Sequence, residues 1–128
     1  MYPVNLKLKG LPCLVIGGGH IAARKVKKLL LEDAEVTVLA PEIYTALMKY
    51  FREKRISWQQ ASYRKGDAKG YRFVVTACGI RQVAEQVHEE SLLQSFLYNA
   101  ADFPPLGNCS LPAAFETGGI HFAISTDG

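Results

Sequence analysis

The sequence has few cysteines and no long hydrophobic run. Its 128 residues include 3 cysteines, which lie far apart at positions 13, 78 and 109 and form no Cys-x-x-Cys pair. An odd number at this spacing argues against a disulfide framework and against a zinc site. No apolar stretch approaches the roughly 18–20 residues of a membrane helix, and the N-terminus does not resemble a secretory signal. We therefore expect a cytoplasmic protein with no membrane partner.

A strong charge of one sign is also missing. The 15 basic and 12 acidic residues give a net charge of +3. Proteins that bind nucleic acid usually carry a stronger or more continuous basic surface, with aromatic side chains interleaved where they bind single strands. We therefore expect no nucleic-acid partner. The basic cluster at residues 24–28 is typical of a solvated helix face, and attraction of a small polyanionic ligand is the second interpretation.

The remaining composition indicates one globular domain, residues 1–128. Hydrophobic residues make up 48% and charged residues 21% of the chain, as in ordinary folded proteins. Short apolar runs rich in β-branched residues alternate with segments of helical spacing. Strands are predicted at residues 12–16, 35–39, 56–59, 71–76 and 96–99, with an additional short strand at 4–8. Helices are predicted at 21–32, 42–54 and 80–95, and a loop at 62–70.

Three glycines lie between the strand at 12–16 and the helix that follows it. Gly17, Gly19 and Ala22 fit the G-x-G-x-x-G/A pattern of dinucleotide sites. Gly17 permits the tight turn, Gly19 lets the backbone approach a pyrophosphate, and Ala22 lets the helix pack closely. N–H groups at the helix start and the helix dipole then bind the anion. The alternative is a glycine-rich turn that binds nothing, but the strand before and the helix after favour a binding site.

The strand–helix alternation ends after residue 99. Residues 111–116 and 120–126 flank Thr117-Gly118-Gly119, which predicts a β-hairpin. We expect its antiparallel strands to extend the edge of the sheet. The predicted fold class is α/β, a Rossmann-like NAD-binding domain. It has a mostly parallel sheet, helices on both faces and a C-terminal antiparallel hairpin.

The other ionisable residues form no recognisable site. The three histidines, His20, His88 and His121, lack the spacing of metal ligands, so no metal site is predicted. Glu89 and Glu90 lie together in the predicted helix 80–95. We interpret this pair as part of a solvated helix face.

Several short blocks resemble one family over nearly the whole chain. The glycine block reads Leu-Val-Ile-Gly-Gly-Gly-His-Ile-Ala-Ala-Arg-Lys at 14–25, and the second strand closes with Ala-Pro-Glu at 40–42. Asn-Ala-Ala-Asp follows at 99–102, and Ala-Ile-Ser-Thr-Asp-Gly at 123–128. These blocks resemble the N-terminal region of siroheme synthases, the precorrin-2 dehydrogenase and sirohydrochlorin ferrochelatase family.

The resemblance implies an NAD-dependent oxidoreductase that converts precorrin-2 to sirohydrochlorin, with a tetrapyrrole as substrate. Some family members also insert ferrous iron. The resemblance places His20 and Ile21 along the dinucleotide, Pro41 and Glu42 at its adenosine half, and a loop at 77–80 beside the nicotinamide half. The residues expected to bind the cofactor are Gly17, Gly18, Gly19, His20, Ile21, Pro41, Glu42, Ala77 and Cys78.

Asp102 falls on the family's essential aspartate and is the expected catalytic residue. It lies in a loop after a strand, where open α/β sheets bind their ligands. A carboxylate there can take the proton released as a hydride leaves a ring carbon, or it can bind a ring nitrogen or the iron. The alternative is an aspartate that caps the turn before Phe103.

The resemblance favours NAD over NADP as the cofactor. In NAD sites an acidic residue about 20 positions after the glycines binds the ribose hydroxyl. Here the acid comes late, at Glu42, and residues 39–43 contain no Arg or Lys that would suit NADP. Glu42 either reaches back to the ribose or the ribose is held differently.

Two departures from the family pattern leave alternatives open. Residues 77–80 read Ala-Cys-Gly-Ile, whereas relatives carry Ala-Thr and acidic residues there. Family members also continue into a helical region that helps form a dimer, and this region is absent from the sequence, so a homodimer is an open expectation. The alternatives are a non-catalytic NAD-binding module or incomplete subunit, and a tetrapyrrole-binding protein that acts only as a chelatase.

Overall fold

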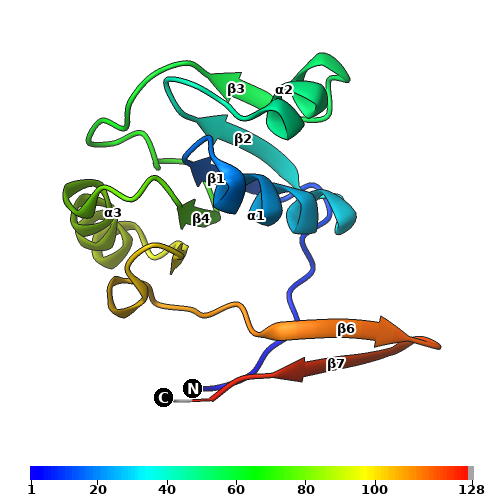
Figure 1. The fold of residues 1–128 in the computed structure, drawn as a ribbon. Coiled ribbons are helices and arrows are strands. Elements are labelled where there is room, and N and C mark those ends of the chain that lie inside the picture. The colour runs from blue at the N-terminus through cyan, green and yellow to red at the C-terminus, as the bar shows by residue number, and fades with distance from the viewer. Residues whose placement is uncertain (127–128) are drawn as a thin grey trace.

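A computed structural model describes residues 1–126, so the last two residues of the Ser-Thr-Asp-Gly block lie outside the described part. Five strands form a parallel sheet in the order β3-β2-β1-β4-β5 (Figure 1). The strands are β1 Pro12–Ile16, β2 Glu35–Leu39, β3 Ser57–Gln59, β4 Phe73–Thr76 and β5 Leu97–Ala100. The helices are α1 His20–Leu31, α2 Thr45–Arg52 and α3 Arg81–Gln94, with a 3-10 turn η1 at Pro104–Leu106. A separate two-stranded sheet contains β6 Ala113–Thr117 and β7 Ile120–Ile124.

The centre of the sheet is buried on both faces, as expected for a parallel sheet whose strands read as continuous apolar runs. In β1, Val15 is paired with Val38 of β2 on one side and with Val75 of β4 on the other. Cys13 and Val15 belong to one hydrophobic cluster, and Leu14 and Ile16 belong to the other. The alternation of β1 side chains therefore joins both halves of the core.

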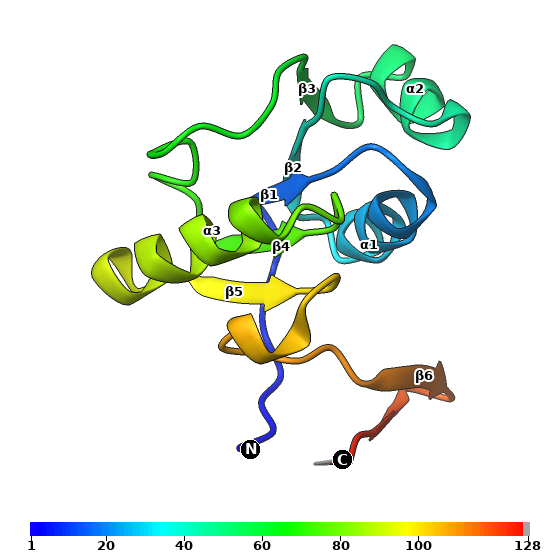
Figure 2. The ribbon, with the colours of Figure 1, turned by 60° about the vertical axis from the view of Figure 1, so that its left-hand side comes forward.

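Helices cover both faces of the sheet, as the sequence predicts. Ala22 and Val26 of α1 and Leu47 of α2 are buried in the cluster on one face. Ala84 and Val87 of α3 are also buried, and Val87 belongs to the cluster on the other face. Figure 2 shows α1 and α3 on opposite sides of the sheet. Among residues 1–126, no helix combines the length and apolar character needed to span a bilayer.

No helix forms between β3 and β4. The segment of residues 60–72 is made of turns and bends, as the sequence predicts for residues 62–70. Its Ala68 is fully buried in the cluster under α3. The segment therefore packs beside α3 and covers part of the same sheet face.

The predicted attachment of the hairpin to the sheet edge is wrong. β6 and β7 pair antiparallel with each other, and all their residues are exposed. The free edge of β5 is occupied instead by Asn108, whose side-chain Oδ1 accepts from Tyr98 N–H at 2.7 Å and whose Nδ2 donates to Phe96 O at 3.0 Å. This side-chain amide uses the β5 groups that another strand would need.

Smaller differences lie at element ends. Residues 1–8 form no strand, so the prediction of an additional short strand at 4–8 is wrong. The second helix begins at Thr45 rather than at residue 42, because Tyr44 is extended and its N–H donates to Gly18 O at 2.6 Å. This bond places residues 41–44 against the glycine loop rather than in the helix.

Candidate functional site

A cleft of about 640 Å³ opens at the carboxyl ends of β1, β2 and β4. The chain runs from β1 outward to β3 and then returns to β4 on the other side of β1. The space between β1 and β4 is therefore the switch point at which open α/β sheets bind ligands. Four stretches supply most of the lining, residues 17–19, 39–44, 61–63 and 77–78.

The first two glycines of the loop are required by the protein's own packing. Gly17 has a φ of +136°, and a Cβ there would lie 2.5 Å from Ala77 O. A Cβ at Gly18 would lie 1.9 Å from Glu42 O. Both glycines thus allow the loop to pass between the ends of β2 and β4.

Gly19 differs from both. Its backbone is extended, with φ −93° and ψ −161°, so other residues could adopt it. A Cβ at this position would meet no protein atom within 4 Å. Nothing in the described part of the chain requires a glycine here, whereas a ligand that approaches the backbone would require one.

The N-terminus of α1 begins at this open position. Gly19 is its N-cap, no side chain caps the helix, and the first turn contains no acidic residue. The N–H groups of His20, Ile21 and Ala22 belong to the first turn, which has no intrahelical acceptors. These donors and the positive end of the helix dipole can bind an anion.

On the β2 side, Pro41 and Glu42 line the cleft together with Tyr44. Trp58 Nε1 donates to Ala40 O at 2.9 Å and holds the end of β2 in place. The His20 ring lies against the Tyr44 ring, with centroids 4.0 Å apart. His20 itself is not among the lining residues.

Ile21, predicted to lie along the dinucleotide, is also absent from the lining, and 44% of it is exposed. Since neither His20 nor Ile21 lines the cleft, the groups they offer to an anion are their backbone N–H groups in the first turn of α1.

On the β4 side, Ala77 and Cys78 line the cleft. Ala77 N–H donates to Ile16 O at 2.8 Å and fixes the loop against β1. Burial, with a further contribution from the Asp102 charge, raises the pKa of Cys78 above its ordinary value. Because the thiolate is the reactive form, Cys78 is suited to filling space rather than to nucleophilic chemistry.

Asp102 lies behind this loop rather than in the lining of the cleft. Its Oδ1 accepts from Thr76 Oγ1 at 3.0 Å, and its Oδ2 accepts from Gly79 N–H at 2.9 Å. The carboxylate therefore ties β4 to the loop at 77–79. Each oxygen keeps a lone pair for a further partner.

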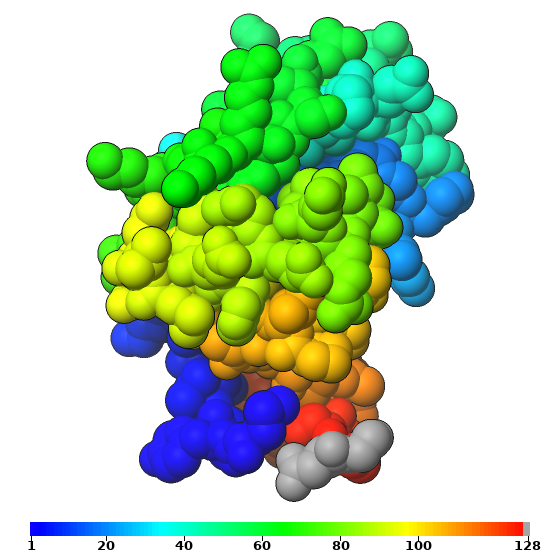
Figure 3. Space-filling view, turned by 90° about the vertical axis from the view of Figure 1, so that its left-hand side faces the viewer, coloured from blue at the N-terminus to red at the C-terminus, as the bar shows by residue number. Residues whose placement is uncertain are grey.

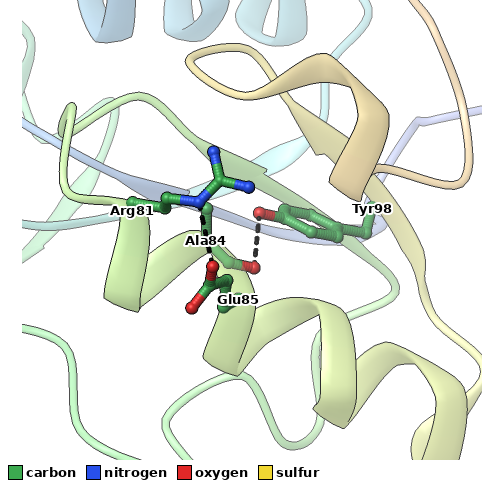
Figure 4. A network of polar contacts seen from close by, with 4 residues as sticks. All are labelled: Arg81, Ala84, Glu85 and Tyr98. Carbon is green, nitrogen blue, oxygen red and sulfur yellow. Dashed lines mark hydrogen bonds and ion pairs between the residues drawn. The ribbon is translucent and has the colours of Figure 1, made fainter.

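The buried hydroxyl of Tyr98 contacts Thr76, the residue that donates to Asp102. The Tyr98 hydroxyl lies 2.7 Å from Thr76 Oγ1. Figure 4 shows its other hydrogen bond, to Ala84 O of α3 at 3.2 Å. Burial raises the pKa of Tyr98 to about 12, although its hydrogen bond to Thr76 opposes the shift. The sequence analysis missed both Thr76 and Tyr98, which read only as strand residues.

The interpretation of Glu89 and Glu90 as one solvated face is wrong for Glu90. Glu89 is exposed, but Glu90 is only 3% exposed. The reason is its position on α3, where Val83, Val87 and Glu90 follow helical spacing on the face toward the core. That spacing was the signal in the sequence that could have placed Glu90 inside.

The three histidines lie on different elements and do not meet. His88 Nδ1 is 2.9 Å from Leu106 O, and His121 lies 3.8 Å from Glu116 on the hairpin. Within residues 1–126, no group of three or more His, Cys, Asp and Glu side chains is arranged to hold a metal ion.

Comparison with known proteins identifies relatives of the whole described fold. A family model with the description "Putative NAD(P)-binding" matches residues 4–113. The siroheme synthase of Nitrosococcus oceani is 34% identical over 126 residues, which cover 98% of this chain and 27% of that protein. The precorrin-2 dehydrogenase of Priestia megaterium is 34% identical over 128 residues, covering 100% of this chain and 63% of that protein.

The fold is also similar to a solved structure. SirC, a precorrin-2 dehydrogenase, superimposes with a TM-score of 0.89 and 35% sequence identity, covering 100% of this chain and 63% of SirC. The chain thus spans about a quarter of the siroheme synthase and less than two thirds of either dehydrogenase.

Proposed function

The chain belongs to the NAD(P)-binding family that its residues match, and from this premise we propose that it binds NAD and oxidises precorrin-2 to sirohydrochlorin. The resemblance to siroheme synthases and precorrin-2 dehydrogenases is confirmed by the comparisons. The proposal assigns the reaction of those relatives to this chain. It is supported by the cleft at the switch point of the sheet.

One observation carries the cofactor assignment. Gly19 has open space where a Cβ would stand, directly before an uncapped helix of 12 residues. That space fits a pyrophosphate, which would accept from the free N–H groups of the first helical turn. The residues present therefore fit a dinucleotide.

The two ends of the cleft suggest how the cofactor is oriented. Pro41 and Glu42 would meet the adenosine half, and Ala77 and Cys78 the nicotinamide half. NAD is preferred to NADP, because Glu42 lies in the lining and its charge repels a 2′-phosphate. Residues 39–43 supply no basic side chain to offset that repulsion.

Asp102 is proposed as the group that takes the proton. Oxidation of precorrin-2 removes a hydride and a proton, and NAD, when bound, accepts the hydride. The hydrogen bonds from Thr76 and Gly79 hold the Asp102 carboxylate in one orientation. A fixed carboxylate at the end of β5 is suited to general base catalysis at the adjoining loop.

The experiment is to mix the chain with precorrin-2 and NAD and to follow NADH and sirohydrochlorin formation by absorbance. Formation of both in equal amounts supports the proposal. Binding of NAD without turnover would instead support the non-catalytic module. Iron insertion into sirohydrochlorin without any NAD binding would support the protein that acts only as a chelatase. A cytoplasmic location and a homodimer stay predictions.

A further inference from the structure

Glu90 is a buried carboxylate with an unusual set of partners. It is 3% exposed, and glutamates are almost never buried to this degree unless they are paired. Neither ion pair found among the described residues includes it. Its Oε2 accepts from the Tyr63 hydroxyl, and its Oε1 accepts from Gly66 N–H.

Both donors come from the segment that links β3 to β4. This segment has no helix of its own, so its position depends on what it contacts. Figure 3 shows it, in green, lying against α3, in yellow-green. Ala68 anchors its far end in the core, and Asp67 Oδ2 accepts from Arg64 N–H at 2.8 Å within the turn.

The same segment forms part of the cleft. Ala61, Ser62 and Tyr63 are all lining residues. Tyr63 therefore links the two, because it lines the cleft and its hydroxyl donates to Glu90. Burial and the hydrogen bond to Glu90 raise the pKa of Tyr63, so the hydroxyl stays protonated and remains a donor.

We propose that Glu90 is a positioning residue for the dinucleotide site, and that it acts by holding Tyr63 and residues 61–66 as a fixed wall of the cleft. The inference rests on the proposed binding of NAD in this cleft. Two hydrogen bonds to one carboxylate restrain the segment at two points, residues 63 and 66. The cofactor then binds to a wall that is already in place, and less conformational entropy is lost on binding.

The test is titration of the 128-residue chain with NAD. Tyr63→Phe should raise the Kd for NAD about tenfold, because loss of one hydrogen bond to a buried charge shifts an equilibrium by that order. Glu90→Ala loses the bonds from both Tyr63 and Gly66 N–H and should raise the Kd at least as much. The double variant should bind no more weakly than Glu90→Ala alone, since both changes break the same contact. Additive effects would mean that Tyr63 contacts the cofactor independently, and they would overturn the inference.

Two further variants control for folding and charge. Glu89→Ala removes the adjacent exposed carboxylate and should leave the Kd unchanged. Glu90→Gln keeps an acceptor for Gly66 N–H and the volume of the side chain, so its Kd should lie between those of the wild type and Glu90→Ala. Thermal melting establishes that each variant is folded, and Glu90→Gln and Tyr63→Phe serve if Glu90→Ala does not fold.

Trypsin provides a readout that does not depend on NAD. Arg64 and Lys65 are exposed within the held segment, so cleavage there should be faster in Glu90→Ala than in Glu89→Ala. If cleavage accelerates but the variants bind NAD as the wild type does, the contact is merely structural and the inference is wrong. If the wild type itself binds no NAD, the proposed function fails together with this inference. That result differs from the previous one, in which the wild type and the variants bind NAD equally.

Discussion

At the scale of single residues, the three consecutive glycines have different physical reasons to be glycine. Gly17 and Gly18 are required by Ala77 O and Glu42 O, which lie where their side chains would be. Gly19 has no such neighbour. Substitutions at the first two therefore test folding, and substitution at Gly19 tests ligand binding.

Gly19→Asp should abolish NAD binding, because a carboxylate would stand where the pyrophosphate is expected. The melting temperature should stay within a few degrees of the wild type, since the position is extended and open. Gly19→Ala is the matched control, with a smaller loss of affinity from its methyl group alone. Calorimetric titration with NAD measures the affinity of each variant. Unchanged affinity in Gly19→Asp would contradict the proposed pocket.

Asp102→Asn should strongly slow dehydrogenation and leave most of the NAD affinity. The amide keeps an oxygen acceptor for Thr76 or Gly79 but cannot take a proton at neutral pH. Loss of a general base lowers turnover by about 10²–10⁴-fold. Asp102→Ala should also weaken NAD binding, because the loop at 77–79 loses its hydrogen bond to the carboxylate. Full turnover by Asp102→Asn would remove its assigned role.

At the scale of elements, apolar runs predicted the strands well. β1 and β2 lie at their predicted residues, 12–16 and 35–39, because both are central strands: β1 is a continuous apolar run, and β2 is apolar or β-branched after Glu35. The hairpin was also found, since Gly118 and Gly119 both have positive φ in its turn. Local pattern is sufficient where a segment's own residues decide its conformation.

The elements that were mispredicted depend on contacts distant in the sequence. Whether the hairpin joins the sheet depends on the edge of β5, and Asn108 occupies that edge through its side chain. The alternation of apolar and polar residues at 111–126 contains no sign that Asn108 occupies the edge of β5. The cleft was located from the glycine motif, whereas Glu90, Tyr63 and Tyr98 were missed because their roles come from partners between 14 and 27 positions away in the sequence.

At the scale of the whole molecule, stability should fall in alkaline solution. The pKa of Tyr98 is raised from 10.0 to about 12 by burial. A raised pKa favours the protonated folded state, so its contribution is fully present below pH 10 and is lost as the pH rises toward 12. Tyr98 alone should lower the free energy of unfolding by up to about 1.4 kcal/mol per pH unit in that window, and Tyr63, whose pKa is also raised, adds to this fall.

Urea unfolding at several pH values measures this slope. Tyr98→Phe should be less stable than the wild type at neutral pH by about 1–2 kcal/mol, because Thr76 and Ala84 O lose a buried partner. Its stability should nevertheless decline less steeply between pH 10 and 12. An equal slope in both proteins would exclude Tyr98 as the titrating group.

We predict that the chain forms a homodimer through one face of the hairpin. Its register places Phe115 opposite Phe122, with Ile120 and Ile124 on the same face. This face is apolar, and its two phenylalanines stack with centroids 4.7 Å apart. An isolated two-stranded sheet is at best marginally stable in water, yet Phe115 is 58% and Phe122 42% exposed. A second copy of the same face would bury both strands symmetrically.

Phe122→Lys should therefore shift the chain from dimer to monomer in sedimentation experiments, because a charge would be buried at the centre of the contact. Leu93→Lys is the matched control, since Leu93 is an apolar side chain on α3 that is 83% exposed. That variant should sediment as the wild type does. The cleft is lined by residues between 16 and 83 and shares none with the hairpin, so NAD affinity should be the same in Phe122→Lys. A wild-type chain that stays monomeric at every concentration would contradict the dimer and leave the cofactor site unaffected.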